Sequence, residues 1–409
     1  MRLILVLSLF LPAFCGAAEQ MAKRGDVFGA SGFYVWQRQW SASVEKSFDD
    51  EIGSGTYDFY VLAGELEYDG KWRSVNVPDR VWRVPLVTAV FRLSVRALDD
   101  PARVAAEVID RAQTLAISRI QLDVDAPERQ IVRYAELVER IRRGWPEIAG
   151  ILWLGATFLP CHLDLKDMRR ILSAIDEPVI QLHGINAPRH RSEKWALMDR
   201  RTVFRALKTA RGLDRRFKMA LPSYAYVLTF NEDGSFRRLY AEGLPDDFEL
   251  PSGIGKEIAS PDLGLLNEIF MSPLRLPAIW FRLPIRGTDR WCLDRETLAM
   301  LERGEKPCPS VEFTVRSGGR PGVVDLVVRY RHQIPLVGTF AVVDWGVKEG
   351  TGEFFPLNGC RVDDDTAYGR LPSRIRVVPF ACGEPFSIGR AVTQCDLQKI
   401  SVREPGEEK

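Results

Sequence analysis

The 409-residue chain has little of several features that mark common protein classes. It holds four histidines and no HExxH or GxSxG motif, which argues against a zinc protease or an α/β-hydrolase. None of its seven cysteines forms a CxxC pair, so a zinc ribbon is not expected. Lysine and arginine together number 56, against 55 aspartates and glutamates. This balance argues against a nucleic-acid partner, which normally meets a basic surplus.

Only one long apolar run is present, and it lies at the N-terminus. Arg2 precedes an apolar stretch over residues 3–15, and small residues follow at 16–18. This stretch is too short to span a bilayer comfortably, so residues 1–18 are expected to be a cleaved signal peptide of a periplasmic or secreted protein. Lipidation at Cys15 is disfavoured because the bulky Phe14 precedes it. No later stretch approaches the length of a transmembrane helix.

Signal cleavage leaves an even number of cysteines, which permits disulfides in an oxidising compartment without revealing their pairing. These six are Cys161, Cys292, Cys308, Cys360, Cys382 and Cys395. The mature chain of about 390 residues exceeds what one hydrophobic core usually supports. We therefore expect a barrel over residues 26–305 and a β-rich domain over residues 308–400.

Short apolar strands alternate with amphipathic helices along the first part of the chain, which is typical of a parallel α/β fold. No glycine-rich phosphate turn follows any of these strands, so a TIM-like (β/α)8 barrel fits better than an open sheet. We expect an insertion around residues 68–77. The predicted strands are 32–36, 57–62, 86–93, 117–124, 148–154, 179–182, 217–221 and 278–283, and the predicted helices are 99–115, 131–145, 165–174, 192–211, 263–270 and 295–303.

After Pro307 the helical period disappears. Apolar or alternating runs lie between turns that contain glycine and proline, and they occupy residues 311–315, 323–329, 336–343 and 374–378. This pattern predicts a C-terminal β-sandwich-like domain.

The sharpest feature is the stretch Gln-Leu-Asp-Val-Asp-Ala-Pro-Glu at residues 121–128. Strand side chains alternate faces, so Gln121, Asp123 and Asp125 share one face and the apolar residues between them share the other. In a barrel, the polar set points inward at the C-terminal end of the strand, where barrel enzymes place their active sites. Two crowded carboxylates repel each other, so one keeps its proton to higher pH, as a general acid must.

Other roles for this acidic pair stay open. The two aspartates could instead cap the following helix, brace nearby loops by hydrogen bonds, or bind an ion. A second acidic stretch, Asp363 to Asp365, could hold calcium, although a solvated loop is favoured because no EF-hand spacing is present.

Aromatic and polar side chains gather at the ends of other predicted strands, and a sugar ring needs both kinds of contact. Each also has an ordinary structural explanation, because tryptophan fills cores and a lone histidine is often simply hydrogen-bonded. The substrate-binding candidates are Trp36, Gln37, Arg38 and Trp40 after the first strand, Gln121 on the fourth, Gln181 and His183 at the sixth, Tyr224 and Tyr226 after the seventh, and Trp280, Arg282 and Trp291 at the last.

Two segments resemble a known family. Residues 35–40, Val-Trp-Gln-Arg-Gln-Trp, and residues 120–126, Ile-Gln-Leu-Asp-Val-Asp-Ala, followed by the helix of Tyr134, are similar to the bacterial domain of unknown function number 3142. The resemblance extends over residues 30–305. It implies a barrel of the glycoside-hydrolase type and assigns no chemistry.

A more distant similarity is to the family 18 chitinase-like glycosidases, whose fourth strand carries an aspartate-rich motif that ends in a glutamate acid. Asp123 and Asp125 match the alternating acids of that motif. The chain then departs from it, because Glu128 comes one residue late, after Pro127. The resemblance therefore leaves Asp125 as the candidate acid.

These observations give one main hypothesis and two alternatives. The main one is an exported glycoside hydrolase acting on a polysaccharide or oligosaccharide, with Asp125 as general acid, Asp123 orienting it, and no cofactor or metal. The first alternative is a non-catalytic carbohydrate-binding or envelope-assembly protein, and the second is a calcium-stabilised structural protein. Oligomeric state, sugar, linkage, disulfide pairing and a second catalytic carboxylate cannot be read from the sequence.

Overall fold

The structure is a computed structural model, and its chain divides into two compact units. The first comprises Met1–Ile185, Met198–Pro222 and Ser272–Leu283, and the second comprises Asn186–Leu197, Ser223–Met271 and Pro284–Lys409. Within them, the structure describes residues 31–55, 57–85, 87–146, 150–184, 187–193, 195–240, 255–285, 292–307, 310–331, 340–345, 352–357, 360–362, 371–376, 386–394 and 397–403.

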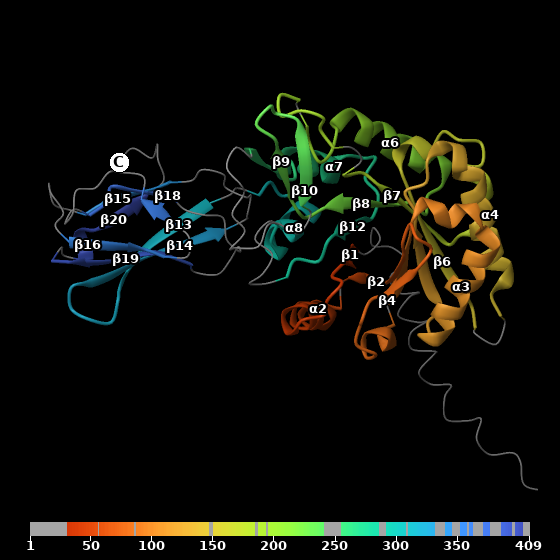
Figure 1. The fold of residues 1–409 in the computed structure, drawn as a ribbon, viewed down its shortest axis with the longest axis horizontal. Helices are drawn as coiled ribbons and strands as arrows, with labels where there is room; N and C mark the ends of the chain where they lie inside the picture. Colours follow the sequence, from red (N-terminus) through yellow and green to blue (C-terminus); the bar gives the residue numbers. More distant parts are fainter. Residues whose placement is uncertain are drawn as a thin grey trace, which may run out of the picture. The chain divides into compact units, whose positions relative to one another are not determined.

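Eight parallel strands of the first unit form a closed ring (Figure 1). In ring order they are β1 (Gly32–Val35), β2 (Asp58–Leu66), β4 (Val87–Leu93), β5 (Arg119–Asp123), β6 (Trp153–Phe158), β7 (Glu177–Gln181), β8 (Lys218–Pro222) and β12 (Ala278–Phe281). The ring is closed because β1 pairs with both β2 and β12. The predicted TIM-like (β/α)8 fold is therefore confirmed. A short strand, β3 (Trp72–Ser74), pairs antiparallel with the end of β2 in the segment expected to be an insertion.

Helices follow most of these strands, and α3 and α4 lie side by side outside the ring (Figure 1). The α3 helix begins as predicted, because Asp100 accepts a 3.1 Å hydrogen bond from the amide of Arg103 and Pro101 occupies the first turn. The helices of this unit are α2 (Ala42–Ser54), α3 (Pro101–Thr114), α4 (Ile131–Gly144), α5 (Met168–Ala174) and α6 (Arg200–Leu213), with 3-10 turns η1 (Val81–Arg83), η2 (Val95–Asp99), η3 (Glu128–Gln130) and η5 (Pro160–His162).

Several elements differ from the sequence-based expectations. The strand expected at 148–154 begins instead at Trp153, because Gly150 has a φ of +80°, which interrupts an extended backbone. The helix expected from residue 192 begins at Arg200, where Asp199 caps it. Helix α2 was not predicted, although Ser41 accepts a hydrogen bond from the amide of Val44 and so supplies its cap.

The inner face of the ring is identified by one buried cluster. Tyr34, Tyr60, Val90, Val179 and Ile279, from five different strands, pack together with Ala220. Because side chains alternate along each strand, these positions fix which residues of every strand point inward.

The N-terminal end of the ring holds a buried ionic network. The ammonium of Lys218 lies 2.7 Å from a carboxylate oxygen of Glu177 and 3.1 Å from one of Asp58, and it donates at 2.8 Å to the hydroxyl of Tyr60. That hydroxyl donates in turn to Glu177 at 2.7 Å. The three N–H donors of the ammonium thus meet three acceptors, which is what a buried charge requires.

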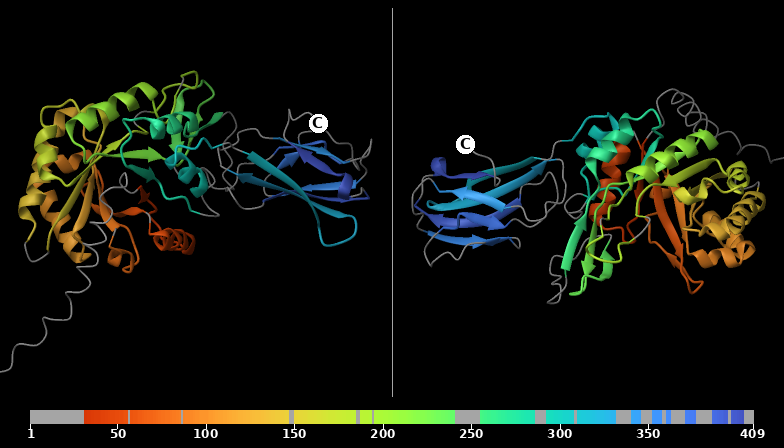
Figure 2. Two further views of the ribbon diagram at one scale, coloured as in Figure 1. Left: turned by 180° about the vertical axis from the view of Figure 1, so that it is seen from behind. Right: turned by 90° about the horizontal axis from the view of Figure 1, so that it is seen from above.

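The second unit contains antiparallel sheets, and two of them share one core (Figure 2). This core is formed by residues such as Leu326, Val343, Ile375 and Ile388, which come from both of these sheets. The predicted β-rich structure is therefore observed after residue 310, while the predicted domain boundaries stay a prediction. The elements are β9 (Tyr226–Phe230), β10 (Phe236–Tyr240), β11 (Gly255–Ala259), α7 (Leu263–Met271), α8 (Arg295–Glu302), β13 (Ser310–Ser317), β14 (Val323–Arg331), β15 (Phe340–Asp344), β16 (Gly352–Pro356), β17 (Arg361–Val362), β18 (Arg374–Arg376), β19 (Phe386–Thr393), η6 (Leu397–Lys399) and β20 (Ser401–Arg403).

Several sequence predictions fall on residues outside the described ranges. They concern the signal peptide at 1–18, Trp291, the acidic stretch 363–365, and Cys15, Cys308, Cys382 and Cys395. Among the described cysteines, Cys161, Cys292 and Cys360, no disulfide joins one to another. None of the helices in the described ranges combines the length and apolar character needed to cross a membrane.

Candidate active site

Strand β5 presents Gln121 and Asp123 to the inside of the ring. Gln121 is fully buried, and its side-chain oxygen accepts a 2.7 Å hydrogen bond from the hydroxyl of Tyr34 on β1. Gly155 on β6 leaves room for it, since an added Cβ there would lie 3.3 Å from Cγ of Gln121. Asp123 follows on the same face as the last residue of β5, at the C-terminal end of the barrel.

The Asp123 carboxylate is partly buried and retains its proton to unusually high pH. Burial, followed by the negative charge of Asp125, raises the pKa of Asp123 to about 6. The hydroxyl of Thr157 on β6, which donates to Asp123 at 2.7 Å, and the positive charge of Arg92 oppose this rise. Asp125 is exposed and lies beyond the end of the strand. The pair therefore combines a proton-holding carboxyl with a solvent-accessible neighbour.

We expect the Asp123→Asn variant to be more stable than the wild type at pH 7.5, by on the order of 1 to 2 kcal/mol, and equally stable near pH 4. Because the folded-state pKa is raised, the native protein binds this proton more tightly than the unfolded chain. The stability that the carboxyl contributes is complete below about pH 4 and is lost as the pH rises through about 6. Asparagine carries no charge, and its oxygen still accepts from Thr157. Calorimetric melting at both pH values checks this.

The matched control for that measurement is Asp110→Asn, which removes an exposed carboxylate on the outside of α3. A gain in stability that is the same at both pH values, or that the control shares, would contradict the prediction.

A buried histidine holds the loop that carries Asp125. The ring of His162 is fully buried in η5, its Nε2 lies 2.7 Å from the carbonyl oxygen of Ala126, and its Nδ1 accepts from the amide of Leu159 at 3.1 Å. These two contacts require the neutral tautomer protonated on Nε2. Burial lowers the pKa of His162, which agrees with that state. Sequence reasoning missed this residue, because no motif links it to the acidic stretch.

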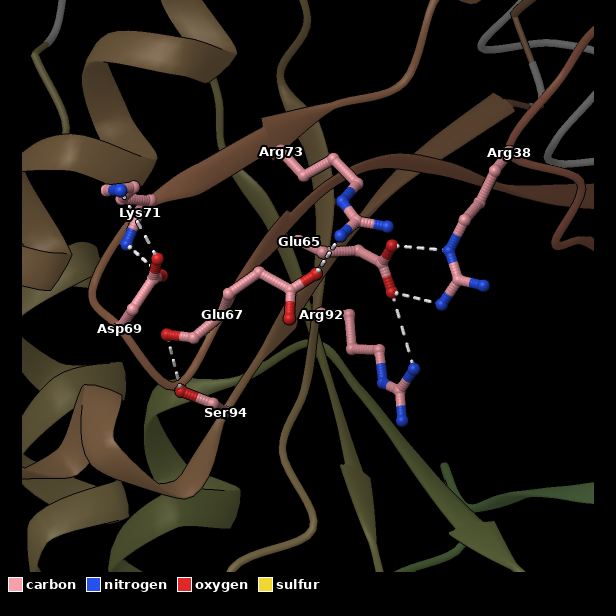
Figure 3. A network of polar contacts seen from close by, with 8 residues as sticks. All are labelled: Arg38, Glu65, Glu67, Asp69, Lys71, Arg73, Arg92 and Ser94. Carbon is pink, nitrogen blue, oxygen red and sulfur yellow. Dashed lines mark hydrogen bonds and ion pairs between the residues drawn. The ribbon is translucent and has the colours of Figure 1, made fainter. Parts of the chain in front are cut away.

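A second carboxylate, Glu65, lies on β2, which β4 separates from β5, and it was also missed (Figure 3). The pairing of β2 with β4 shifts register between Leu62 and Gly64, so a bulge turns Glu65 toward the face that Arg92 shares. In register, Glu65 is opposite Arg92, and Arg92 is opposite Asp123.

Two arginines contact the Glu65 carboxylate. Arg38, in the loop after β1, donates to it through Nε at 2.6 Å and Nη2 at 2.9 Å, and Arg92 donates through Nη1 at 3.3 Å. Burial alone would raise the pKa of Glu65, but the hydrogen bond and charge of Arg38, with those of Arg92, hold it below the usual value. Glu65 is therefore an ionised group that is already fully engaged.

Aromatic side chains lie at the same end of the barrel. Trp36 packs against Tyr34 and Phe281, with ring centroids 5.8 Å and 5.0 Å apart. Phe281 also contacts the ring of His183 at 5.2 Å. Burial lowers the pKa of His183 to about 3, so this imidazole is neutral at physiological pH.

The remaining predicted residues divide between this region and other places. Gln37 donates to the carbonyl of Leu283 at 3.4 Å, and Gln181 donates to the carbonyl of His183 at 3.3 Å. Trp40 packs on Phe48 of α2, with centroids 5.4 Å apart. These contacts place Gln37 and Gln181 at strand ends and direct Trp40 toward a helix.

Trp280 does not point into the ring, whereas Arg282 and Tyr224 lie just after β12 and β8, where they were predicted. Ile279 and Phe281 belong to the inner cluster, so alternation places the fully buried Trp280 on the outer face of β12 rather than inside the ring. Arg282 is buried just after that strand. Tyr224 belongs to the second unit, where its hydroxyl donates to that of Tyr226 at 2.8 Å.

Glu128 has different surroundings from Asp123 and Asp125. It is exposed on η3, and burial, followed by the charge of Glu128, raises the pKa of the Cys161 thiol. Across the ranges that the structure describes, no three histidine, cysteine, aspartate or glutamate side chains form a group suited to a metal ion. The side chains at the end of β5 can donate and accept hydrogen bonds, and the Asp123 carboxyl can hold a proton.

Comparison with known proteins finds one matching family model and several similar solved structures. The model of a domain of unknown function, DUF3142, matches residues 89–286, which include the acidic stretch after β5 and exclude residues 35–40. The resemblance inferred from the sequence is thereby confirmed for this part of the chain. No curated protein matches the chain.

Several solved structures are similar at low identity. A spore cortex-lytic enzyme of Bacillus megaterium is 12% identical over 68% of this chain and 76% of its own, with a TM-score of 0.48. A chitinase of Chromobacterium violaceum is 11% identical over 68% and 99%, with a TM-score of 0.49. A family 18 chitinase of Flavobacterium johnsoniae is 10% identical over 62% and 89%, with a TM-score of 0.42. The assignment of the barrel rests on the strand pairing described above.

Proposed function

We propose that this protein hydrolyses a glycosidic bond at the C-terminal end of its barrel. The observation that carries the proposal is the Asp123–Asp125 pair, in which Asp123 has a pKa of about 6 and Asp125 is exposed to solvent. Such a pair holds a proton near neutral pH and can deliver it to a leaving oxygen. Asp125 is the proposed proton donor, and Asp123 is its electrostatic partner.

The other groups have supporting roles in this proposal. Trp36 and Phe281 offer ring faces against which the apolar face of a sugar can pack. Through its contact with Ala126, His162 keeps the donor loop in place. Thr157 orients Asp123 by its 2.7 Å hydrogen bond.

Glu65 is unsuited to act as the nucleophile, because both of its carboxylate oxygens accept hydrogen bonds from arginine. A glycosidase with one available acidic pair can use the 2-acetamido group of its substrate as the nucleophile instead. We therefore propose 2-acetamido sugars as the substrate class, and export by the N-terminal signal as the route by which the enzyme meets them.

The proposal is tested by incubating the full chain with oligosaccharides that differ only in whether they carry 2-acetamido groups, such as chitotetraose and cellotetraose. We expect the release of new reducing ends from the acetamido compound alone, with a maximum between about pH 5 and 7 because the pKa of Asp123 is about 6. Absence of cleavage across a broad panel of such sugars would contradict hydrolysis.

The engagement of Glu65 by arginine also favours a second candidate, a carbohydrate-binding protein without turnover. In that case saccharide binding, measured by calorimetry, would persist in an Asp125→Asn variant while no glycan is cleaved by the wild type.

A further inference from the structure

Helix α6 lies on the outside of the ring and carries a concentration of positive charge (Figure 1). Its 14 residues include four arginines and one lysine, and no acidic residue lies between Arg200 and Leu213. Arg201, Arg205 and Lys208 are exposed and recur at intervals of four and three residues, so they form one stripe along the helix. At a rise of about 1.5 Å per residue, this α6 stripe extends over about 10 Å.

One carboxylate acts on the α6 stripe. Asp199 caps the helix by accepting a 2.8 Å hydrogen bond from the amide of Thr202. The hydrogen bonds of Thr202, and then the charges of Arg201 and Arg205, lower the pKa of Asp199. Within the described part of the chain, no ion pair joins Arg201, Arg205 or Lys208 to a carboxylate. Positive charge therefore remains in excess on this face after Asp199 is counted.

Helix α4 also carries four arginines but arranges their charges differently. Arg133 and Arg140 pair with Glu136 at 3.8 Å and 2.8 Å, and Arg143 pairs with Glu139 at 3.8 Å. Opposite charges at these spacings stabilise a helix surface, whereas like charges at the same spacing destabilise it. The unbalanced charge is thus a property of α6 rather than of every arginine-rich helix of this barrel.

The charges of α6 oppose its own stability. Arg201 and Arg205 are four residues apart, so they repel each other on the helix surface. Arg201 is also in the first turn, where positive charge is unfavourable to the helix dipole. An anionic partner would relieve this repulsion when it binds.

The opposite side of α6 is used by the fold. Val203, Ala206, Leu207 and Ala210 are buried, so the apolar face of the helix is not available to enter a bilayer. The side that a partner can reach is the charged one. Because a helix surface is convex, it presents its charges to a flat partner rather than enclosing a small ligand.

We propose that the α6 stripe docks this protein on a membrane surface that contains anionic phospholipids. The headgroup phosphates supply the negative charge that α6 lacks, and a flat layer of them can meet all three cations at once. Without insertion of apolar side chains, the docking is electrostatic, so it is reversible and strongly weakened by salt. This inference is independent of the proposed hydrolysis, because it concerns the outside of the ring.

The test measures co-sedimentation of the full chain with vesicles of equimolar phosphatidylglycerol and phosphatidylcholine, and with vesicles of phosphatidylcholine alone. We expect binding to the anionic vesicles only, and its loss at high salt. Each cation near an anionic surface contributes roughly fivefold, so the triple variant Arg201→Gln, Arg205→Gln, Lys208→Gln should bind about 100-fold more weakly. Lys208→Gln alone should lose about fivefold, which keeps the test decisive if the triple variant were unstable. Equal binding to both kinds of vesicle would overturn the inference.

The matched control removes the same amount of charge from cations that already have a carboxylate partner. Lys46 pairs with Asp50, Lys71 with Asp69, and Arg103 with Glu107. The triple variant Lys46→Gln, Lys71→Gln, Arg103→Gln should therefore bind anionic vesicles nearly as the wild type does. Equal weakening in the two triple variants would mean that net charge alone decides binding, and it would contradict docking through α6.

Two competitors distinguish a membrane from other anionic partners. Glycerol phosphate should release the protein from vesicles no more than sodium chloride of the same ionic strength does, and stronger release would indicate a site for single phosphate groups instead. Hyaluronan that binds more tightly than the vesicles, with the same dependence on α6, would assign the stripe to an acidic polysaccharide. Cleavage of soluble oligosaccharides should be unchanged in the α6 variant, so failure of docking and failure of hydrolysis are separate results.

Discussion

Replacement of Asp125 by asparagine is expected to lower the rate of glycan cleavage by about 10²- to 10⁴-fold. This is the range that general acid catalysis typically contributes, and asparagine cannot donate the proton that the leaving oxygen needs. Asp125 is exposed, and removing its charge relieves repulsion of Asp123, so the substitution should not lower the unfolding free energy. The loss should therefore lie in kcat rather than in the amount of folded protein, as steady-state kinetics and circular dichroism would show.

The leaving group provides the decisive comparison. In an aryl glycoside with an acidic phenol, the phenolate leaves without much protonation. On this substrate the rate of the Asp125→Asn variant should therefore fall by only about tenfold or less. Asp110→Asn, an exposed aspartate on α3, is the matched control and should retain wild-type rates. If the variant lost as much activity on the aryl glycoside as on the natural linkage, Asp125 would not be the proton donor.

The two aspartates should also behave as one unit. The pKa of Asp123 is raised partly by the charge of Asp125, so replacing Asp125 alters the protonation of Asp123. We therefore expect the double variant to be little worse than Asp125→Asn alone, since the contributions of coupled catalytic groups are not additive.

Much of this arrangement could be predicted from the sequence because β5 has a clear contrast between its faces. Polar residues alternate with leucine and valine there, so Gln121 and Asp123 could be placed on the inner side once a barrel was inferred. Asp125 could be placed near them, but its exposed position depends on where the strand ends, which the alternation does not reveal.

The last strand lacked such a contrast. In β12 both faces are apolar and largely buried, because one face packs inside the ring and the other is covered on the outside of the ring. Alternation then divides Ile279 and Phe281 from Trp280 without saying which set lies inside. The choice of Trp280 as a sugar-facing residue followed from its chemistry, whereas the packing of the ring places its neighbours inward.

Glu65 was hidden by a backbone irregularity. The sequence predicted a strand that ends at residue 62, whereas β2 continues to Leu66 and shifts register between Leu62 and Gly64. A single extra residue reverses the faces of everything after it, so no periodicity count could have assigned Glu65 to the inner side.

Removal of the Lys218 ammonium should destabilise the barrel more than any surface substitution. Lys218→Met deletes the partner of two carboxylates, of which Glu177 is 4% exposed and Asp58 is 15% exposed. Breaking a buried ion pair from one side typically costs about 3 to 5 kcal/mol, because an uncompensated charge stays buried. We expect a loss of this size in the free energy of unfolding at pH 7, measured by urea denaturation.

The loss in the free energy of unfolding of Lys218→Met should be smaller in acid. Without the ammonium, the native variant keeps two uncompensated negative charges in a buried place, so neutralising them in acid should restore part of its stability. Lys208→Met, an exposed lysine on α6, is the matched control and should change stability by less than about 0.5 kcal/mol at either pH. Adding Glu177→Gln to Lys218→Met should recover part of the loss, since it removes the more buried of the two orphaned charges. A Lys218→Met variant that melts like the control at pH 7 would mean that water enters this end of the ring and solvates the carboxylates.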